Sequence, residues 1–117
     1  MFTKDKLAVL RKASEIETVR KEGRSFSNRY VVLVTKKRAA AVPGYALIAS
    51  RTVGGAVERN RCKRRMRSRV AMFAAGIVDD YDFVLIARKD LLTAEADTLD
   101  KAFKQLFMKA GLIHDHD

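Results

Sequence analysis

The sequence predicts an α+β fold, a small sandwich in which helices pack on a mixed β-sheet. Three observations lead to this prediction. The chain has 117 residues, which is enough for one hydrophobic core and leaves little room for a second. Apolar residues make up 48% of it, with a single proline, so residues 1–117 are expected to form one folded domain. Strand-like segments are interspersed with segments of helical periodicity, in the expected order α-β-β-β-α-β-α, in which one of the first three strands is not assigned to particular residues.

The first helix is predicted to begin near Ser14. Residues 14–17 have the form of a capping box, in which the side chains of Ser14 and Glu17 satisfy exposed backbone N–H groups at a helix start. Ile16 and Val19 would share one face, and Gly23 is a natural stop. A short helix of about two turns is therefore expected.

Two strands are predicted next. Residues 28–36, NRYVVLVTK, are rich in the β-branched and aromatic side chains that favour strands. Alternation divides this strand into two faces, Tyr30, Val32 and Val34 against Val31 and Leu33. Pro43-Gly44 marks a turn into residues 45–50, YALIAS, the second strand. The short connection favours antiparallel pairing of the two strands.

A long helix is predicted from the break at Gly54-Gly55 to about residue 75. Its buried face is expected to contain Cys62, Met66, Val70 and Phe73, which recur at helical spacing. A second stripe with the same spacing is fully polar and consists of Asn60, Lys63, Arg64 and Arg67. Two further arginines, Arg61 and Arg65, flank it.

One strand and one helix complete the series. Residues 81–88, YDFVLIAR, are nearly continuously apolar, which predicts a central strand covered on both faces. An amphipathic helix is then predicted that stops at Gly111, from the spacing of Leu99, Ala102, Phe103, Leu106, Phe107 and Ala110. Residues 112–117 are expected to be a flexible tail.

Positive charge is concentrated in the long helix. The formal net charge is +10, and residues 59–69, RNRCKRRMRSR, contain seven cationic side chains and no acid. Such a run often only faces solvent. Here, however, six of the seven are arginines, whose planar guanidinium groups bind phosphate through two hydrogen bonds. Asn60 lies among them and can bind a base edge or a ribose hydroxyl. The backbone N–H groups at Gly54-Gly55 are also expected to attract phosphate, with Glu58 partly offsetting them. The sequence therefore favours nucleic acid as the partner.

These residues also carry a resemblance to a known family. Residues 46–67, ALIASRTVGGAVERNRCKRRMR, resemble the signature of the bacterial ribonuclease P protein component, which centres on Arg-Asn-Arg followed by Lys-Arg and a further Arg. The similarity extends over nearly the whole chain. Val19 with Gly23-Arg24, then Asn28-Arg29, the strand DFVLIAR and the final helix occur in the family's order.

The resemblance implies both an activity and a fold. Members of the family bind a large catalytic RNA, and the ribonucleoprotein removes the 5′ leader from precursor tRNA. The RNA performs the hydrolysis with Mg²⁺, so no catalytic residue is expected in this chain. The fold implied is the ribosomal protein S5 domain 2-like arrangement, with a left-handed β-α-β crossover, where general rules favour the right-handed form.

The resemblance also assigns two sets of residues. The RNA-binding set is Arg51, Arg59, Asn60, Arg61, Lys63, Arg64, Arg65 and Arg67. The leader-binding cleft, between the first helix and the sheet, is expected to contain Ile16, Arg20, Tyr30, Val32 and Val34. Family members often have aromatic residues at the positions of Ile16, Arg20 and Val34, so base stacking is expected to contribute less here.

Two other functions are compatible with the charge and the size. A structural RNA-binding protein, such as a ribosomal protein, would need no leader cleft. A DNA-binding module would place the long helix in the major groove, but the basic residues wrap around much of this helix, and no second helix is placed as in a helix-turn-helix.

The remaining features concern the compartment, the oligomeric state and metal binding. No apolar run approaches the roughly 18 residues of a membrane span, and the single Cys62 agrees with a reducing, cytoplasmic compartment. The free protein is expected to be a monomer. Two groups of side chains resemble metal ligands but are not expected to bind metal: Asp79, Asp80 and Asp82, and His114 with His116.

Overall fold

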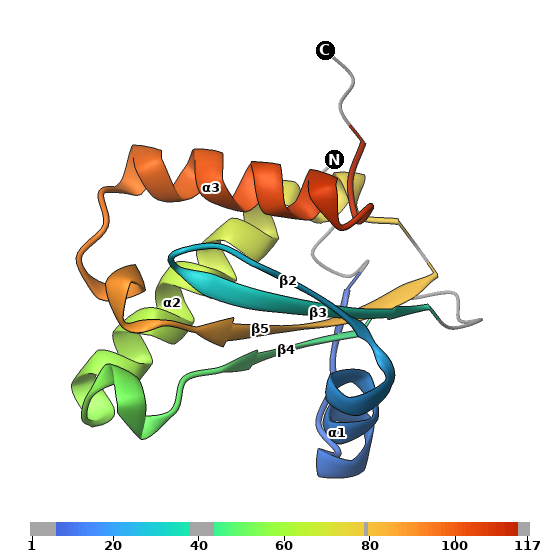
Figure 1. Ribbon diagram of the computed structural model, residues 1–117, viewed down its shortest axis with the longest axis horizontal. Helices are drawn as coiled ribbons and strands as arrows, with labels where there is room; N and C mark the ends of the chain where they lie inside the picture. Colours follow the sequence, from blue (N-terminus) through green and yellow to red (C-terminus); the bar gives the residue numbers. More distant parts are fainter. Residues whose placement is uncertain (1–6, 38–43, 79, 115–117) are drawn as a thin grey trace.

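The computed structural model describes residues 7–37, 44–78 and 80–114 (Figure 1). The helices and strands are β1 (Ala8–Val9), α1 (Ala13–Glu22), β2 (Arg24–Ser27), β3 (Val31–Lys37), β4 (Gly44–Ile48), α2 (Ala56–Phe73), β5 (Tyr81–Ala87) and α3 (Ala96–Lys109). Short 3₁₀ helices lie at η2 (Arg51–Val53), η3 (Ala74–Gly76) and η4 (Lys89–Leu92). From α1 onward the order is the predicted α-β-β-β-α-β-α, and the α+β class is confirmed. None of the helices in the described residues is long and apolar enough to cross a membrane.

All the strands belong to one mixed sheet, in the order β1-β4-β5-β3-β2. β5 lies at the centre, antiparallel to β3 and parallel to β4, which confirms the predicted central strand. The predicted pairing of residues 28–36 with 45–50 is wrong, because β5 lies between the two. A short connection keeps two strands close together but does not make them neighbours in the sheet. β5 is apolar on both faces, so it buries the most apolar surface when it takes the central position.

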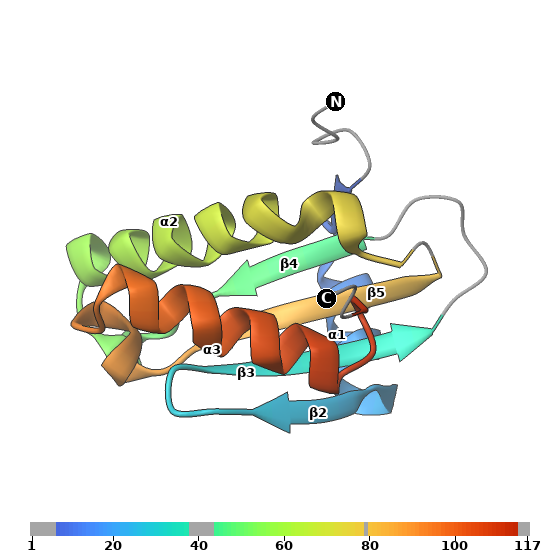
Figure 2. The same ribbon diagram turned by 90° about the horizontal axis from the view of Figure 1, so that it is seen from above.

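The connection from β4 to β5 gives the fold its handedness. These neighbouring parallel strands are joined through α2, and in Figure 2, seen from the helix side, the path from β4 over α2 to β5 is left-handed. This hand is rare in general, and it confirms what the family resemblance implies. As a result, the basic helix lies along the β4 side of the sheet (Figure 2).

The two faces of the sheet carry separate hydrophobic cores. The larger core lies beneath α2 and α3 and includes Cys62, Met66 and Val70, as predicted. The smaller core, on the opposite face, consists of Leu10, Val19, Val34, Ala46 and Val84. α1 lies over one end of this second face (Figure 1), and no other helix of the described residues covers the rest of it.

The start of α1 differs from the prediction. Its N-cap residue is Lys12, which makes no side-chain cap hydrogen bond. Ser14 lies inside the first turn, where its carbonyl accepts a hydrogen bond of 2.9 Å from the Thr18 hydroxyl. The predicted capping box of Ser14 and Glu17 is therefore wrong, because the helix begins earlier in the chain than Ser14.

The hairpin of β2 and β3 was not fully predicted. β2 pairs with β3 in antiparallel register, although RSFS has too few apolar residues to indicate a strand. In the turn, the Asn28 side chain accepts hydrogen bonds from the N–H groups of Tyr30 and Val31, at 2.8 and 3.0 Å. β3 therefore begins at Val31, later than predicted.

The chain beyond α3 returns to the core. Gly111, with φ of 79°, ends the helix in a Schellman motif, in which the Leu112 N–H donates to the Phe107 carbonyl at 2.9 Å. Leu112 and Ile113 are buried. The predicted flexible tail is thus wrong for these two residues, whose apolar side chains are directed inward by the motif. Residues 115–117 lie outside the described residues.

Candidate RNA interface

The start of α2 depends on a glycine. Gly54 has φ of 138°, and a Cβ atom there would lie 2.7 Å from Cβ of Glu58. The Gly55 N–H donates a hydrogen bond of 2.9 Å to the Glu58 carboxylate. One of the N–H groups expected to attract phosphate is therefore already bound, and the carboxylate places negative charge at the helix start.

The exposed side of α2 carries polar residues that have no partners among the residues that the structure describes. Asn60, Arg64 and Arg67 are exposed, and Arg59 and Lys63 are partly exposed. Neither Arg64 nor Arg67 forms an ion pair or hydrogen bond with any residue that the structure describes. Their hydrogen-bonding capacity is available to an anionic ligand. Arg51 is also exposed, in η2, just before the start of α2.

Other arginines of α2 face the connection between β5 and α3. Arg61 Nε and Arg65 Nη1 both donate to the Leu92 carbonyl, at 3.2 and 3.1 Å, and Arg65 Nη2 donates to Ala94. Burial lowers the pKa of Arg65, with a further contribution from the neighbouring Arg69 and Arg61 guanidinium groups. Arg65 therefore has a structural role, and of the predicted RNA-binding set it is the least available to RNA.

Arg69 continues this structural side of the helix. It is buried, and its Nε lies 3.2 Å from Oδ1 of Asp100 on α3. In the sequence, no acid lies four residues before or after any of these arginines. The compensating carboxylate and carbonyl groups come from a different element, which spacing within one helix cannot reveal.

Cys62 lies on the buried side of α2, between the exposed arginines and those that contact the rest of the protein. Burial raises the pKa of its thiol, and the charges of Arg65 and Arg61 oppose the shift. The thiol is fully buried, as expected for a small apolar core residue.

Opposite α2, part of the sheet face beside α1 is open. We call the row Val32, Ile86 and Ile48 the open sheet face; Val32 and Ile48 both pair with Ile86 across the sheet. All three are partly exposed, whereas the next row, which includes Val34, is buried beneath α1. Apolar side chains left at the surface in this way suit contact with a partner.

The predicted cleft residues are therefore only partly brought together. Ile16 and Val32 pack around the smaller core near the open sheet face, and Arg20 is exposed one turn from Ile16 on α1. Val34 is 4% exposed, too little for contact with a ligand. Tyr30 packs against the larger core on the other face of the sheet. It belongs to the turn formed by Asn28, so the alternation of side chains in β3 does not extend to it.

Two residues of the open sheet face, Ile48 and Ile86, were missed from the sequence. Alternation within residues 45–50 and 81–88 shows which side chains share a face. The register that aligns Ile48, Ile86 and Val32 in one row depends on the position of β5 between β4 and β3, which the sequence did not predict.

A cavity of about 190 Å³ joins the basic helix to α1. It is lined by Val9, Leu10, Ile16, Tyr45, Ala46, Leu47, Lys63 and Arg67. The structure thus brings a residue of the predicted leader-binding set, Ile16, close to two residues of the predicted RNA-binding set.

The acidic residues around the start of β5 have structural contacts. The Asp82 carboxylate is buried and accepts a hydrogen bond of 2.9 Å from the Gly44 N–H. Asp80 lies 3.7 Å from the Lys37 ammonium group. Asp79 and His116, which the sequence analysis also considered, lie outside the described residues.

Comparison with known proteins identifies the family. The family described as Ribonuclease P matches residues 5–111. The chain belongs to the ribonuclease P protein family. The ribonuclease P protein component of Exiguobacterium sp. is 35% identical over 101 residues, covering 86% of this chain and 88% of the relative. That of Symbiobacterium thermophilum is 37% identical over 100 residues, covering 83% and 85%.

Solved structures of ribonuclease P proteins have the same fold. The Staphylococcus aureus protein matches with a TM-score of 0.81 at 21% identity, over 91% of this chain and 97% of that one. The Thermotoga maritima protein matches with a TM-score of 0.73 at 26% identity, over 83% and 93%. The chain is accordingly a protein component of ribonuclease P, the ribonucleoprotein endoribonuclease that processes the 5′ end of tRNA, and its partner is the ribonuclease P RNA.

Proposed function

We propose that this chain binds the catalytic RNA through the exposed side of α2 and the 5′ leader of precursor tRNA through the open sheet face. Hydrolysis then takes place in the RNA with Mg²⁺, and the protein supplies no catalytic residue. The observation that carries the proposal is the cavity between Ile16, Lys63 and Arg67, because it places two cations of α2 beside Ile16, which packs against the smaller core next to the open sheet face.

The α2 surface suits the phosphate groups of folded RNA. Arg64 and Arg67 are exposed without protein partners among the described residues, and they project from a helix that is anchored through its opposite side. Binding of each phosphate releases condensed counterions, which favours association. Asn60 lies on the exposed surface of the same helix, where it can bind a ribose hydroxyl or a base edge.

The open sheet face suits the bases of a single strand. Val32, Ile48 and Ile86 offer an aliphatic surface, and cations near its borders, Arg20 on α1 and Lys63 on α2, are available to phosphates. A base on an aliphatic surface gains less than one stacked on an aromatic ring, which contributes about 1–3 kcal/mol. The leader is therefore held by contact area and charge rather than by stacking.

The affinities of precursor and mature tRNA for the assembled holoenzyme test the proposal. Ile86→Asp places a carboxylate beneath the leader phosphates, and we expect it to weaken precursor binding roughly tenfold, or about 1.4 kcal/mol, while mature tRNA binding is unchanged. Thr98→Asp, an exposed position on α3, is the matched control and should behave as the wild type.

The alternative of a structural RNA-binding protein without a processing role makes the opposite prediction. If the wild-type protein left the ratio of precursor to mature affinity unchanged, the leader site would be excluded. Light scattering of the free protein tests the further expectation that it is a monomer.

A further inference from the structure

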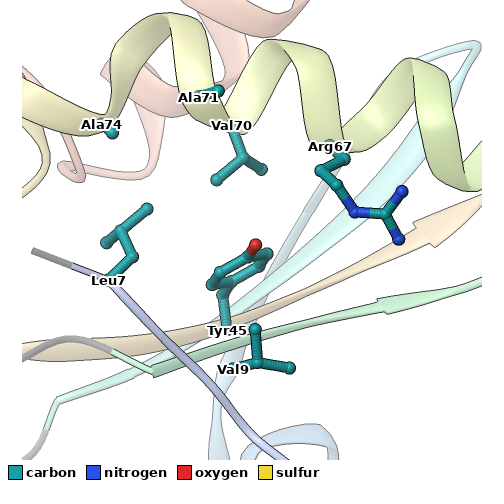
Figure 3. Close-up of a pocket in the computed structure, with 7 residues that line it drawn as sticks. All are labelled: Leu7, Val9, Tyr45, Arg67, Val70, Ala71 and Ala74. Atoms are coloured by element: carbon teal, nitrogen blue, oxygen red, sulfur yellow. The ribbon is translucent and has the colours of Figure 1, made fainter. Parts of the chain in front are cut away.

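A second cavity, of about 350 Å³, lies on the α2 side of the sheet edge. It is lined by Leu7, Val9, Tyr45, Arg67, Val70, Ala71 and Ala74. Figure 3 shows Tyr45 and Val9 facing the helix, with Leu7 and Ala74 at one end and Arg67 at the other. Its volume is near the lower limit of small-molecule sites, about 300–1,000 Å³, so it suits a small planar group.

The lining combines an aromatic ring, aliphatic walls and one cation. The Tyr45 ring is held in place by Phe83, with the ring centroids 5.7 Å apart and the planes 20° from parallel. Val9 is 51% exposed, so this wall is left in contact with water. A nucleobase fits such a site, since its faces are apolar and its phosphate would lie near a guanidinium group.

The cavity adjoins the one that reaches α1, since Val9, Tyr45 and Arg67 line both. Together they form a groove around the edge of β4. β1 pairs with β4 only at Gly44 and Tyr45, and the Leu10 N–H donates to the Tyr45 carbonyl at 2.8 Å. Backbone groups two residues apart face the same side of a strand, so the N–H and C=O of Leu47 point toward this groove.

We propose that this groove extends the leader-binding surface and that the cavity at Tyr45 binds one unstacked base of the leader. The inference rests on the proposed function of the open sheet face. The leader is the occupant because a single strand can supply an unstacked base, and because the groove begins at Ile16 on α1. Lys63 and Arg67 along the groove favour an anionic strand over an apolar ligand.

Filling the cavity tests the inference. Ala71 is exposed on α2 and lines the cavity, so Ala71→Phe occupies it from the helix side. Ala96→Phe makes the same change at an exposed position of α3 outside the groove. Holoenzymes with each protein are titrated with precursor tRNAs of increasing leader length, and thermal unfolding verifies that both variants fold.

For the wild type and Ala96→Phe, affinity should rise with leader length until one nucleotide reaches the cavity. Ala71→Phe should lose this last increase, a factor between about five and one hundred, as expected for a stacked base. Affinity for precursors with shorter leaders should be unchanged. In the wild-type holoenzyme, 4-thiouridine at that leader position should cross-link to residues 7–9 or Tyr45.

Three results would overturn the inference while leaving the proposed function intact. The first is equal leader-length profiles for Ala71→Phe and Ala96→Phe, and the second is cross-links to this cavity from the catalytic RNA instead of the leader. The third is tighter leader binding after deletion of residues 1–6, which would make the amino-terminal segment the occupant. If the wild-type protein showed no preference for precursor over mature tRNA, the proposed function and the inference would fail together.

Discussion

At the scale of single residues, the arginines of α2 separate into two groups. Arg65 is anchored to carbonyl groups of the segment that leads into α3, and Arg69 to the Asp100 carboxylate of α3 itself. Arg64 and Arg67 face outward without protein partners among the described residues. A run of arginines in the sequence therefore combines structural residues with ligand-binding ones, and the contacts of each side chain distinguish them.

The first prediction concerns stability. Arg65→Ala should lower the free energy of unfolding by about 1–3 kcal/mol, because hydrogen bonds from a charged, partly buried group are lost. Arg64→Ala should change it by less than about 0.5 kcal/mol. Urea unfolding of the two proteins measures the difference, and equal stabilities would contradict the structural role of Arg65.

The second prediction concerns affinity for the catalytic RNA. Arg64→Ala and Arg67→Ala should each reduce the slope of log affinity against log salt by about 0.7–0.9, the contribution of one phosphate contact. Lys104→Ala, exposed on α3, should leave the slope unchanged. An unaltered slope in the double variant would exclude both arginines as phosphate ligands.

At the scale of elements, helix α2 shows what sequence patterns predict well and where they stop. The periodicity of Cys62, Met66 and Val70 predicted its buried face, because helical spacing is a local property. The row of Val32, Ile86 and Ile48 was not predictable in the same way, since it requires the order of strands in the sheet. Tyr30 was misplaced because one side chain, Asn28, ends the alternation of the strand.

The third prediction concerns the start of α2. Gly54→Ala should cost about 1–2 kcal/mol of stability, because the residue has φ of 138° and its Cβ would meet Glu58. Gly76→Ala is the matched control, since a Cβ there has no neighbour nearer than 3.9 Å. Thermal unfolding of both variants is the measurement; similar melting temperatures would mean that the turn accommodates a side chain.

At the scale of the whole molecule, two different surfaces meet at the β4 edge of the sheet. The outer side of α2 carries cations that have no partner among the described residues, and the sheet face beside α1 carries partly exposed aliphatic side chains. The left-handed connection places α2 next to β4 (Figure 2). A shared cavity brings Lys63 and Arg67 of α2 close to Ile16 of α1. With a net charge of +10, the molecule is suited to hold two RNA segments side by side.

The most direct test of this account is cleavage of 5′-labelled precursor tRNA by the catalytic RNA at low magnesium concentration, with and without the protein. The account predicts strong stimulation by the wild type, with the cut at the mature 5′ end. It also predicts that the Arg64→Ala, Arg67→Ala double variant stimulates much less, whereas Lys104→Ala matches the wild type. Tight binding of the wild-type protein to the catalytic RNA without any stimulation of cleavage would contradict it.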